Sequence, residues 1–158
     1  MLKWLWLSSL MIVLDQASKW WMVSWLSLYE TVAVVPYFNL TMAHNYGAAF
    51  SFLADAGGWQ KWFFIVLASV VSLVLIVWIA KLKPTAKLEA ISLSLILGGA
   101  IGNVIDRIYY GYVIDFLDVY YGSFHWPAFN IADSAICIGA VLLIIDTLIH
   151  SDDKAVSS

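Results

Sequence analysis

Charged side chains are scarce in this 158-residue chain, where Asp, Glu, Lys and Arg make up only 12% of the residues. Hydrophobic residues account for 63%, and the mean hydropathy is +0.86. Soluble globular domains average about 25% charged and about 45–50% apolar residues, so the composition excludes an ordinary soluble domain. Nine Trp and eight Tyr supply the amphipathic rings that settle at membrane–water interfaces. We therefore predict an integral membrane protein.

Features of several other protein classes are also missing. The chain has no basic run and a formal net charge of -3, which argues against a nucleic-acid partner. Its one cysteine, Cys137, excludes a disulfide framework and a cysteine-based metal site, and we expect it to pack as a small apolar residue. His44 and His125 lack the spacing of a metal site. No serine has the context of a nucleophile elbow, and no glycine-rich loop that of a phosphate cradle.

Four windows are long and apolar enough to cross a bilayer, because a helix that rises about 1.5 Å per residue needs about 20 residues. They cover about 4–28, 62–80, 88–105 and 131–149 of one integral membrane domain, residues 1–158. The first window does not predict a cleaved signal peptide. Asp15 and Lys19 interrupt it, and no small-residue cleavage site follows a short apolar core.

Lysines mark one side of the predicted membrane protein. The turn KLKPTAK between the second and third windows holds Lys81, Lys83 and Lys87, while Lys3 and Lys154 lie near the two termini. Because Lys and Arg accumulate in cytoplasmic loops, both termini and this turn are predicted to be cytoplasmic. The two long loops, about 29–61 and 106–130, are then predicted to face outward.

The first of these loops contains the run TVAVVPYFNLTMAHNYGAAFSF, which is rich in β-branched and aromatic residues. With Pro36 and Gly47 in it, this run predicts short strands and turns. The predicted fold is an all-α membrane protein of four transmembrane helices, with a small strand-rich extracytoplasmic cradle in the first outer loop. No internal repeat is evident, which argues against an inverted-repeat transporter.

Two ionisable residues interrupt the first window, although each costs about 2.5–3.5 kcal/mol at mid-bilayer. Asp15 and Lys19 are four residues apart, so they share one helix face and can pair. We favour a structural ion pair that supports the site over a proton relay or a substrate contact.

The third window carries glycines and polar residues on neighbouring stripes. Gly98 and Gly102 form a small-xxx-small seam that allows another helix to approach closely. Asn103 and Arg107 are four residues apart on an adjoining stripe. The guanidinium of Arg107 could neutralise a carboxylate or hold a peptide carbonyl.

Acidic residues follow in the second outer loop and at the start of the fourth window. Asp106 is either exposed at the helix end or paired with a cation, and Asp118 is expected to be solvated. Asp115 has apolar neighbours on both sides, which predicts partial burial and a raised pKa. Asn130 is a candidate N-cap, and Asp133 falls in the first helical turn, where an acid also complements the helix dipole.

Asp115 and Asp133 could activate a shared water, as the carboxylate pair of aspartic proteases does. The residues alone leave two alternatives open: a small transporter or channel component, and a non-catalytic assembly protein that binds other helices through Gly98 and Gly102. The second window has few polar residues, which argues against a continuous ion pathway.

Five short motifs occur in order at consistent spacing: LDQASK at 14–19, HNYGAAFSFLAD at 44–55, GGAIGNVIDR at 98–107, GYVIDFLD at 111–118 and FNIADSAIC at 129–137. From about residue 4 to residue 148 the chain resembles lipoprotein signal peptidase (signal peptidase II), a family of bacterial membrane proteases. The resemblance implies a catalytic pair at Asp115 and Asp133. It implies substrate-binding or supporting roles for Asn45, Gly47, Asn103, Arg107, Asn130, Asp15 and Lys19.

The resemblance also implies the substrate, a signal peptide that ends before a cysteine bearing a diacylglyceryl group. Cleavage would occur at the outer face of the bacterial cytoplasmic membrane, in contact with membrane lipid and without a metal or organic cofactor. We expect a monomer. The first outer loop would clamp the substrate, with Asn45 and Gly47 close to its backbone. Because the helix dipole favours a charged Asp133 while apolar neighbours retain the proton of Asp115, we predict Asp133 as the base and Asp115 as the acid.

Overall fold

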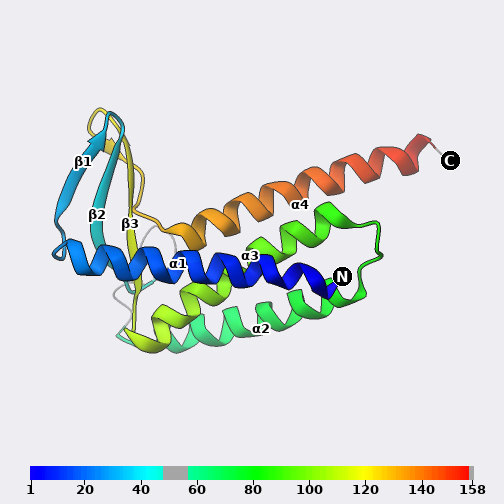
Figure 1. Cartoon of the computed structure of the whole chain (residues 1–158), viewed down its shortest axis with the longest axis horizontal. Coiled ribbons are helices and arrows are strands. Elements are labelled where there is room, and N and C mark those ends of the chain that lie inside the picture. The colour runs from blue at the N-terminus through cyan, green and yellow to red at the C-terminus, as the bar shows by residue number, and fades with distance from the viewer. Residues whose placement is uncertain (48–56, 157–158) are drawn as a thin grey trace.

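The computed structural model describes residues 1–47 and 57–156, with side chains described as far as residue 149. A short 3-10 helix, η1 (Leu2–Trp4), leads into α1 (Leu5–Trp25), and three further long helices are α2 (Gln60–Lys81), α3 (Lys87–Tyr109) and α4 (Ile131–Val156). The strands are β1 (Thr31–Val35), β2 (Phe38–Asn45), β3 (Val113–Tyr121) and β4 (Phe124–His125). Figure 1 shows the strands gathered at one end of the helices, while the N-terminus, the α2–α3 turn and the end of α4 lie at the other.

Helix α3 occupies the centre of the helical part and packs against α1, α2 and α4. Its glycines allow this close approach. A Cβ on Gly98 would lie 2.8 Å from the Cβ of Met11, and one on Gly102 would lie 2.6 Å from Oδ2 of Asp15. A Cβ on Gly99 would overlap the carbonyl oxygen of Ala132. The predicted seam is therefore confirmed: Gly98 and Gly102 face α1, and Gly99 faces α4.

Three of the described helical segments have the length and composition needed to cross a membrane: Gln60–Lys81, Lys87–Tyr109 and Ile131–Ile149. They correspond to the second, third and fourth predicted spans. Helix α1, which carries Asp15 and Lys19, is not among them. A fourth span therefore stays a prediction.

The strands form one antiparallel sheet in the order β1-β2-β3-β4. Strands β1 and β2 confirm the strands predicted in the first long loop. The prediction was wrong in confining the sheet to that loop, because β3 and β4 come from the second. The segment VIDFLDVYY is rich in β-branched and aromatic residues and pairs with β2, with Leu40 opposite Leu117 and Ala43 opposite Asp115. Asp115 consequently lies on a strand that is held on both sides.

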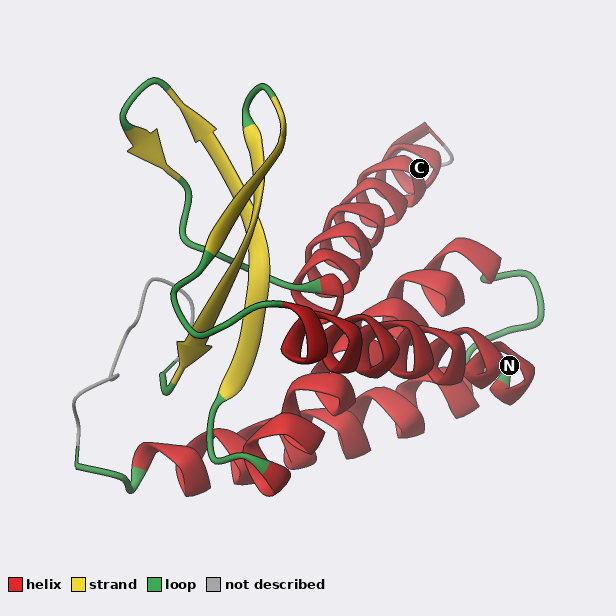
Figure 2. Ribbon diagram, turned by 60° about the vertical axis from the view of Figure 1, so that its left-hand side comes forward, coloured by secondary structure: helices red, strands yellow, loops and turns green. Residues whose placement is uncertain are grey.

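A small hydrophobic core joins the sheet to the end of α1. It is formed by side chains from α1, the segment after it, β2 and β3, namely Met22, Leu26, Met42, Ile114 and Phe116. Since successive side chains of a strand point to opposite faces, Asp115 points away from its neighbours Ile114 and Phe116. Figure 2 shows the sheet standing beside the ends of the helices. Because the core contains side chains of both α1 and β3, it fixes β3 relative to α1.

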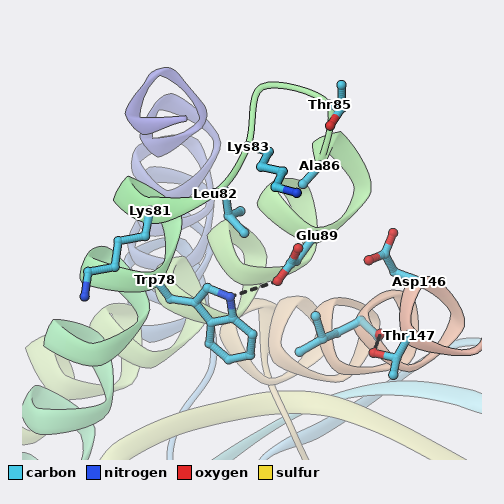
Figure 3. Close-up of a pocket in the computed structure, with 10 residues that line it drawn as sticks. Trp78, Lys81, Leu82, Lys83, Thr85, Ala86, Glu89, Asp146 and Thr147 are labelled. Atoms are coloured by element: carbon cyan, nitrogen blue, oxygen red, sulfur yellow. Dashed lines mark hydrogen bonds between the residues drawn. The ribbon is translucent and has the colours of Figure 1, made fainter. Parts of the chain in front are cut away.

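Two features of the helices lie apart from the sheet. A groove of about 760 Å³ lies near the α2–α3 turn, and in it Trp78 Nε1 donates to Glu89 Oε1 at 2.8 Å. Figure 3 shows this hydrogen bond and Asp146, which also lines the groove. On α4, Cys137 is exposed, contrary to the expectation that it packs inside. The buried face of α4 includes Ala135 and Gly139, and Cys137 lies two residues from each, on the opposite side of the helix.

Candidate active site

Asp115 lies on β3 with its carboxylate buried among amide donors. Its Oδ1 accepts a hydrogen bond from Asn130 Nδ2 at 2.7 Å, and its Oδ2 accepts one from Asn45 Nδ2 at 3.0 Å. Burial, and secondarily the charge of Asp133, raise the pKa of Asp115 to about 7, against the lowering effect of the two amides. The burial and the raised pKa predicted from its apolar neighbours are confirmed.

Asp133 lies in the first turn of α4, as predicted. Its Oδ1 accepts a hydrogen bond from Asn103 Nδ2 at 2.8 Å. The predicted N-cap is confirmed as well, because the backbone N–H of Asp133 donates to Asn130 Oδ1 at 2.9 Å.

Asn130 connects these two aspartates through one carboxamide. Its Nδ2 binds the carboxylate of Asp115, and its Oδ1 accepts from the backbone of Asp133. Its side chain is fully buried, so no water competes for these bonds. The structure therefore places Asp115 and Asp133 in one site, where the charge of Asp133 acts on Asp115.

A buried cation lies behind the two aspartates. Lys19 Nζ is 2.8 Å from Asp15 Oδ2 and 2.8 Å from Asp106 Oδ2, and it donates to Asn103 Oδ1 at 3.1 Å. The predicted structural ion pair of Asp15 and Lys19 is thus confirmed and includes a second acid. Of the two alternatives for Asp106, pairing with a cation is correct, and exposure is wrong because its side chain is fully buried.

Both acids also bind backbone amides next to the aspartates of the site. Asp15 Oδ1 accepts from the N–H of Ala132 at 2.9 Å, and Asp106 Oδ2 accepts from the N–H of Ile114 at 3.1 Å. Ala132 and Ile114 immediately precede Asp133 and Asp115. The ion pairs around Lys19 therefore hold the backbone at both positions.

The first loop reaches the site through Asn45 and Gly47. Arg107 Nη2 donates to the carbonyl of Gly47 at 2.8 Å, and Gly47 N–H donates to Asn45 Oδ1 at 3.0 Å. The guanidinium also lies 5.1 Å from the ring centre of Phe64, and its charge acts on both aspartates. All the predicted site residues thus meet in one region. The remainder of the HNYGAAFSFLAD motif, residues 48–55, lies outside the described residues.

Two polar residues, Asp118 and Gln16, differ from the sequence-based interpretation. Asp118 was expected to be solvated, but it is buried, because Asn39 lies opposite it in the sheet and donates at 2.8 Å, while His125 Nδ1 lies 2.9 Å away. Gln16 was not singled out, yet its Nε2 donates to Asp106 Oδ1 at 2.8 Å. The available signal was an uncharged amide inside a helix that is otherwise largely apolar.

Metal ligands are not grouped in the described part of the chain. Among residues 1–47 and 57–149, no three His, Cys, Asp or Glu side chains are arranged to hold a metal ion. The chemistry of this site is that of carboxylates, carboxamides and two cations.

The fold and this site define a class of protein: a membrane protein with two aspartates held in one polar site, the pairing with which aspartic peptidases activate water. Residues 7–149 match the family described as Signal peptidase (SPase) II. The chain is 54% identical to the lipoprotein signal peptidase of Alteromonas mediterranea, over 98% of this chain and 85% of the relative. It is 51% identical to that of Photorhabdus laumondii, over 98% of this chain and 93% of the relative. The chain belongs to the signal peptidase II family and is a peptidase of that type.

The fold is also similar to that of a solved structure. The chain is similar to a bacterial membrane enzyme determined by the in meso method at 2.3 Å resolution, with a TM-score of 0.87 and 29% sequence identity. This similarity covers 96% of this chain and 91% of that enzyme.

Proposed function

We propose that the protein removes signal peptides from prolipoproteins, cleaving before a diacylglyceryl-modified cysteine, with Asp115 and Asp133 as the catalytic pair. The observation that carries the proposal is the carboxamide of Asn130, which joins both aspartates in one buried polar site. Family membership supports the reaction class, and the relatives are lipoprotein signal peptidases. Membership of this family also disfavours the transporter and assembly-protein alternatives.

The reaction follows from two carboxylates that share one proton. Ionised Asp133 takes a proton from water as the water oxygen attacks the scissile carbonyl carbon, and protonated Asp115 donates its proton to the carbonyl oxygen. In the second step Asp133 gives its proton to the leaving nitrogen, the C–N bond breaks, and Asp115 recovers its proton from the collapsing diol. The products are a signal peptide with a terminal carboxylate and a lipoprotein with a free amino group on its cysteine.

The assignment of acid and base is supported by the surroundings of each carboxylate. The pKa of Asp115, raised to about 7 mainly by burial, keeps a large protonated fraction near neutral pH. Asp133 lies at a helix N-terminus, where the dipole favours its charged form, and it accepts a hydrogen bond from Asn103. Two adjacent carboxylates do not ionise together easily, so one serves as acid and the other as base.

The other residues bind or support. Asn103 and Asn130 orient the two carboxylates, while Asp15 and Lys19 hold the backbone behind them. Arg107 fixes Gly47, which leaves Asn45 and Gly47 beside Asp115 where an extended substrate backbone would pass.

Membrane placement completes the proposal. Helix α1 is the fourth span, because its 21 residues rise about 32 Å and exposed tryptophans near its sheet end, among them Trp20, Trp21 and Trp25, suit the bilayer border. The two termini and the lysine turn lie at the end of the molecule away from the sheet (Figure 1), which supports cytoplasmic termini and a site at the outer face of the bacterial inner membrane. The protein works as a monomer in contact with lipid.

The test is cleavage of a diacylglyceryl-modified prolipoprotein by purified protein in detergent. Asp115→Asn and Asp133→Asn should each reduce kcat at least about 100-fold, since each removes one partner of a proton transfer. Asp146→Asn, the same change far along α4, is the matched control and should cleave normally. Turnover near the wild-type rate by both site variants, correctly inserted, would exclude this mechanism.

A further inference from the structure

Gln16 occupies an unusual position on the inner face of α1. It is half-buried beside Asp15, and its Nε2 lies 2.8 Å from Asp106 Oδ1 and 3.2 Å from both Asp15 Oδ2 and the carbonyl oxygen of Gly102. A side-chain amide in a membrane helix is costly without partners, and its NH₂ group has two hydrogens to share among these three acceptors. The amide is therefore used to connect groups on α1 and α3.

The two acids that Gln16 contacts are those that hold the backbone next to the proposed catalytic pair. Asp106 binds the N–H of Ile114, one residue before Asp115, and Asp15 binds the N–H of Ala132, one residue before Asp133. Lys19 forms ion pairs with both acids, but an ammonium group on a flexible stem acts as a point charge. A planar amide that is hydrogen-bonded to both acids also restricts the orientation of the two carboxylates relative to each other.

We infer that Gln16 is a positioning residue: by joining Asp15 to Asp106, it fixes the separation between Asp115 on β3 and Asp133 on α4. The inference rests on the proposed function, because the separation matters only if these two carboxylates share a water. Strand β3 is connected through Asp106 and helix α4 through Asp15, so the Gln16 amide links the two supports alongside Lys19. Gln16 itself contacts neither aspartate of the pair.

The electrostatics of Asp115 provide a readout of this separation. Groups from three helices face it: Asp133 from α4, Arg107 from α3 and Lys19 from α1, together with two amide donors. Among these, the charge of Asp133 raises the pKa of Asp115, and this effect weakens as the two carboxylates move apart. Loss of the hydrogen bonds that Gln16 makes to Asp15 and Asp106 should therefore lower the pKa of Asp115.

The experiment compares Gln16→Met with Leu14→Met in full-length protein in detergent, with the lipidated prolipoprotein as substrate. Leu14 is exposed on the same helix and receives the same new side chain, so it is the matched control. Because a misplacement of about 1 Å costs about 100-fold in rate, Gln16→Met should lower kcat by roughly 10- to 100-fold with little change in KM. The alkaline limb of its pH–rate profile should move to lower pH. Leu14→Met should match the wild type in kcat and in the position of the alkaline limb.

A merely structural role predicts a different result. It would reduce the fraction of active enzyme but leave kcat per active site and the alkaline limb unchanged, and that outcome would overturn the inference. In a second variant, Gln16→Glu, the new carboxyl group lies beside two carboxylates, so it should hold a proton below neutral pH and donate it to Asp106. It should retain more activity than Gln16→Met below neutral pH, and equal activity of the two variants at every pH would also contradict the proposal.

Asp115→Asn and Asp133→Asn belong in the same assay. If both are inactive while Gln16→Met behaves as the wild type, the positioning role fails and the proposed function stands. If both aspartate variants turn over, the proposed function itself fails.

Discussion

Replacing Asn130 by serine separates two of the hydrogen bonds that its carboxamide makes, one to Asp133 and one to Asp115. A serine hydroxyl can still accept the N–H of Asp133 and cap α4, as Asn130 Oδ1 does at 2.9 Å. It cannot replace the hydrogen bond of 2.7 Å that Asn130 Nδ2 donates to Asp115 Oδ1. Since that bond favours the charged form of Asp115, its loss should raise the pKa of Asp115 above the value of about 7.

The size of the shift follows from the strength of a hydrogen bond to a charged group. Such a bond contributes about 1.5–3 kcal/mol, and one pKa unit corresponds to about 1.4 kcal/mol. Asn130→Ser should therefore raise the pKa of Asp115 by about 1–2 units. Because Asp115 acts as the acid, the alkaline limb of the activity profile should move to higher pH by the same amount.

The assay is kcat/KM against pH with the lipidated prolipoprotein, together with thermal denaturation of each variant. Asn130→Ala is the companion variant: it loses the N-cap as well and should be about 1 kcal/mol less stable than Asn130→Ser, with a similar alkaline limb. An alkaline limb that stays in place or moves to lower pH in a stable Asn130→Ser protein would refute the assignment of Asp115 as the acid.

Three further predictions concern stability and are checked by denaturation in detergent. The pKa of Asp115 is raised on folding, so its contribution to stability is complete below about pH 4 and is lost as the pH rises to about 7. Asp115→Asn should therefore reduce the fall in stability between these pH values. An unchanged dependence of stability on pH would contradict this. Lys19→Met leaves two buried acids without their cation and should cost about 3–5 kcal/mol, whereas Lys87→Met at an exposed position should change stability by less than about 0.5 kcal/mol. Gly102→Ala places a Cβ 2.6 Å from a carboxylate oxygen of α1 and should cost about 1–3 kcal/mol, and a stability equal to the wild type would refute the close packing.

The sequence predicted the helical part of the fold because membrane helices satisfy their backbone locally. The apolar windows correspond to α2, α3 and most of α4, and the small-residue seam at Gly98 and Gly102 is where α1 packs. The strands of the first loop were also predicted from composition. Strand β3 was missed, since a β-rich segment beside a helix end gives a weak signal until its pairing partner is known.

The candidate site was predicted as a set of residues but not as a network. Asn45, Asn103 and Asn130 stand at motif positions, yet nothing in a single sequence indicates which carboxylate each one binds. Asp118 was misjudged for the same reason, because Asn39, the residue opposite it, is 79 residues away in the chain.

The sequence by itself determined the membrane class, the long helices and the residues that could carry chemistry, because hydrophobic length and short-range spacing are local properties. The tertiary structure alone decided which polar groups meet. Asp15 binds the backbone of Ala132 across 117 residues, and Gln16 reaches Asp106 across 90. Such pairings depend on how α1, α3, α4 and β3 pack in space, and buried polar groups are stable only when that packing supplies their partners.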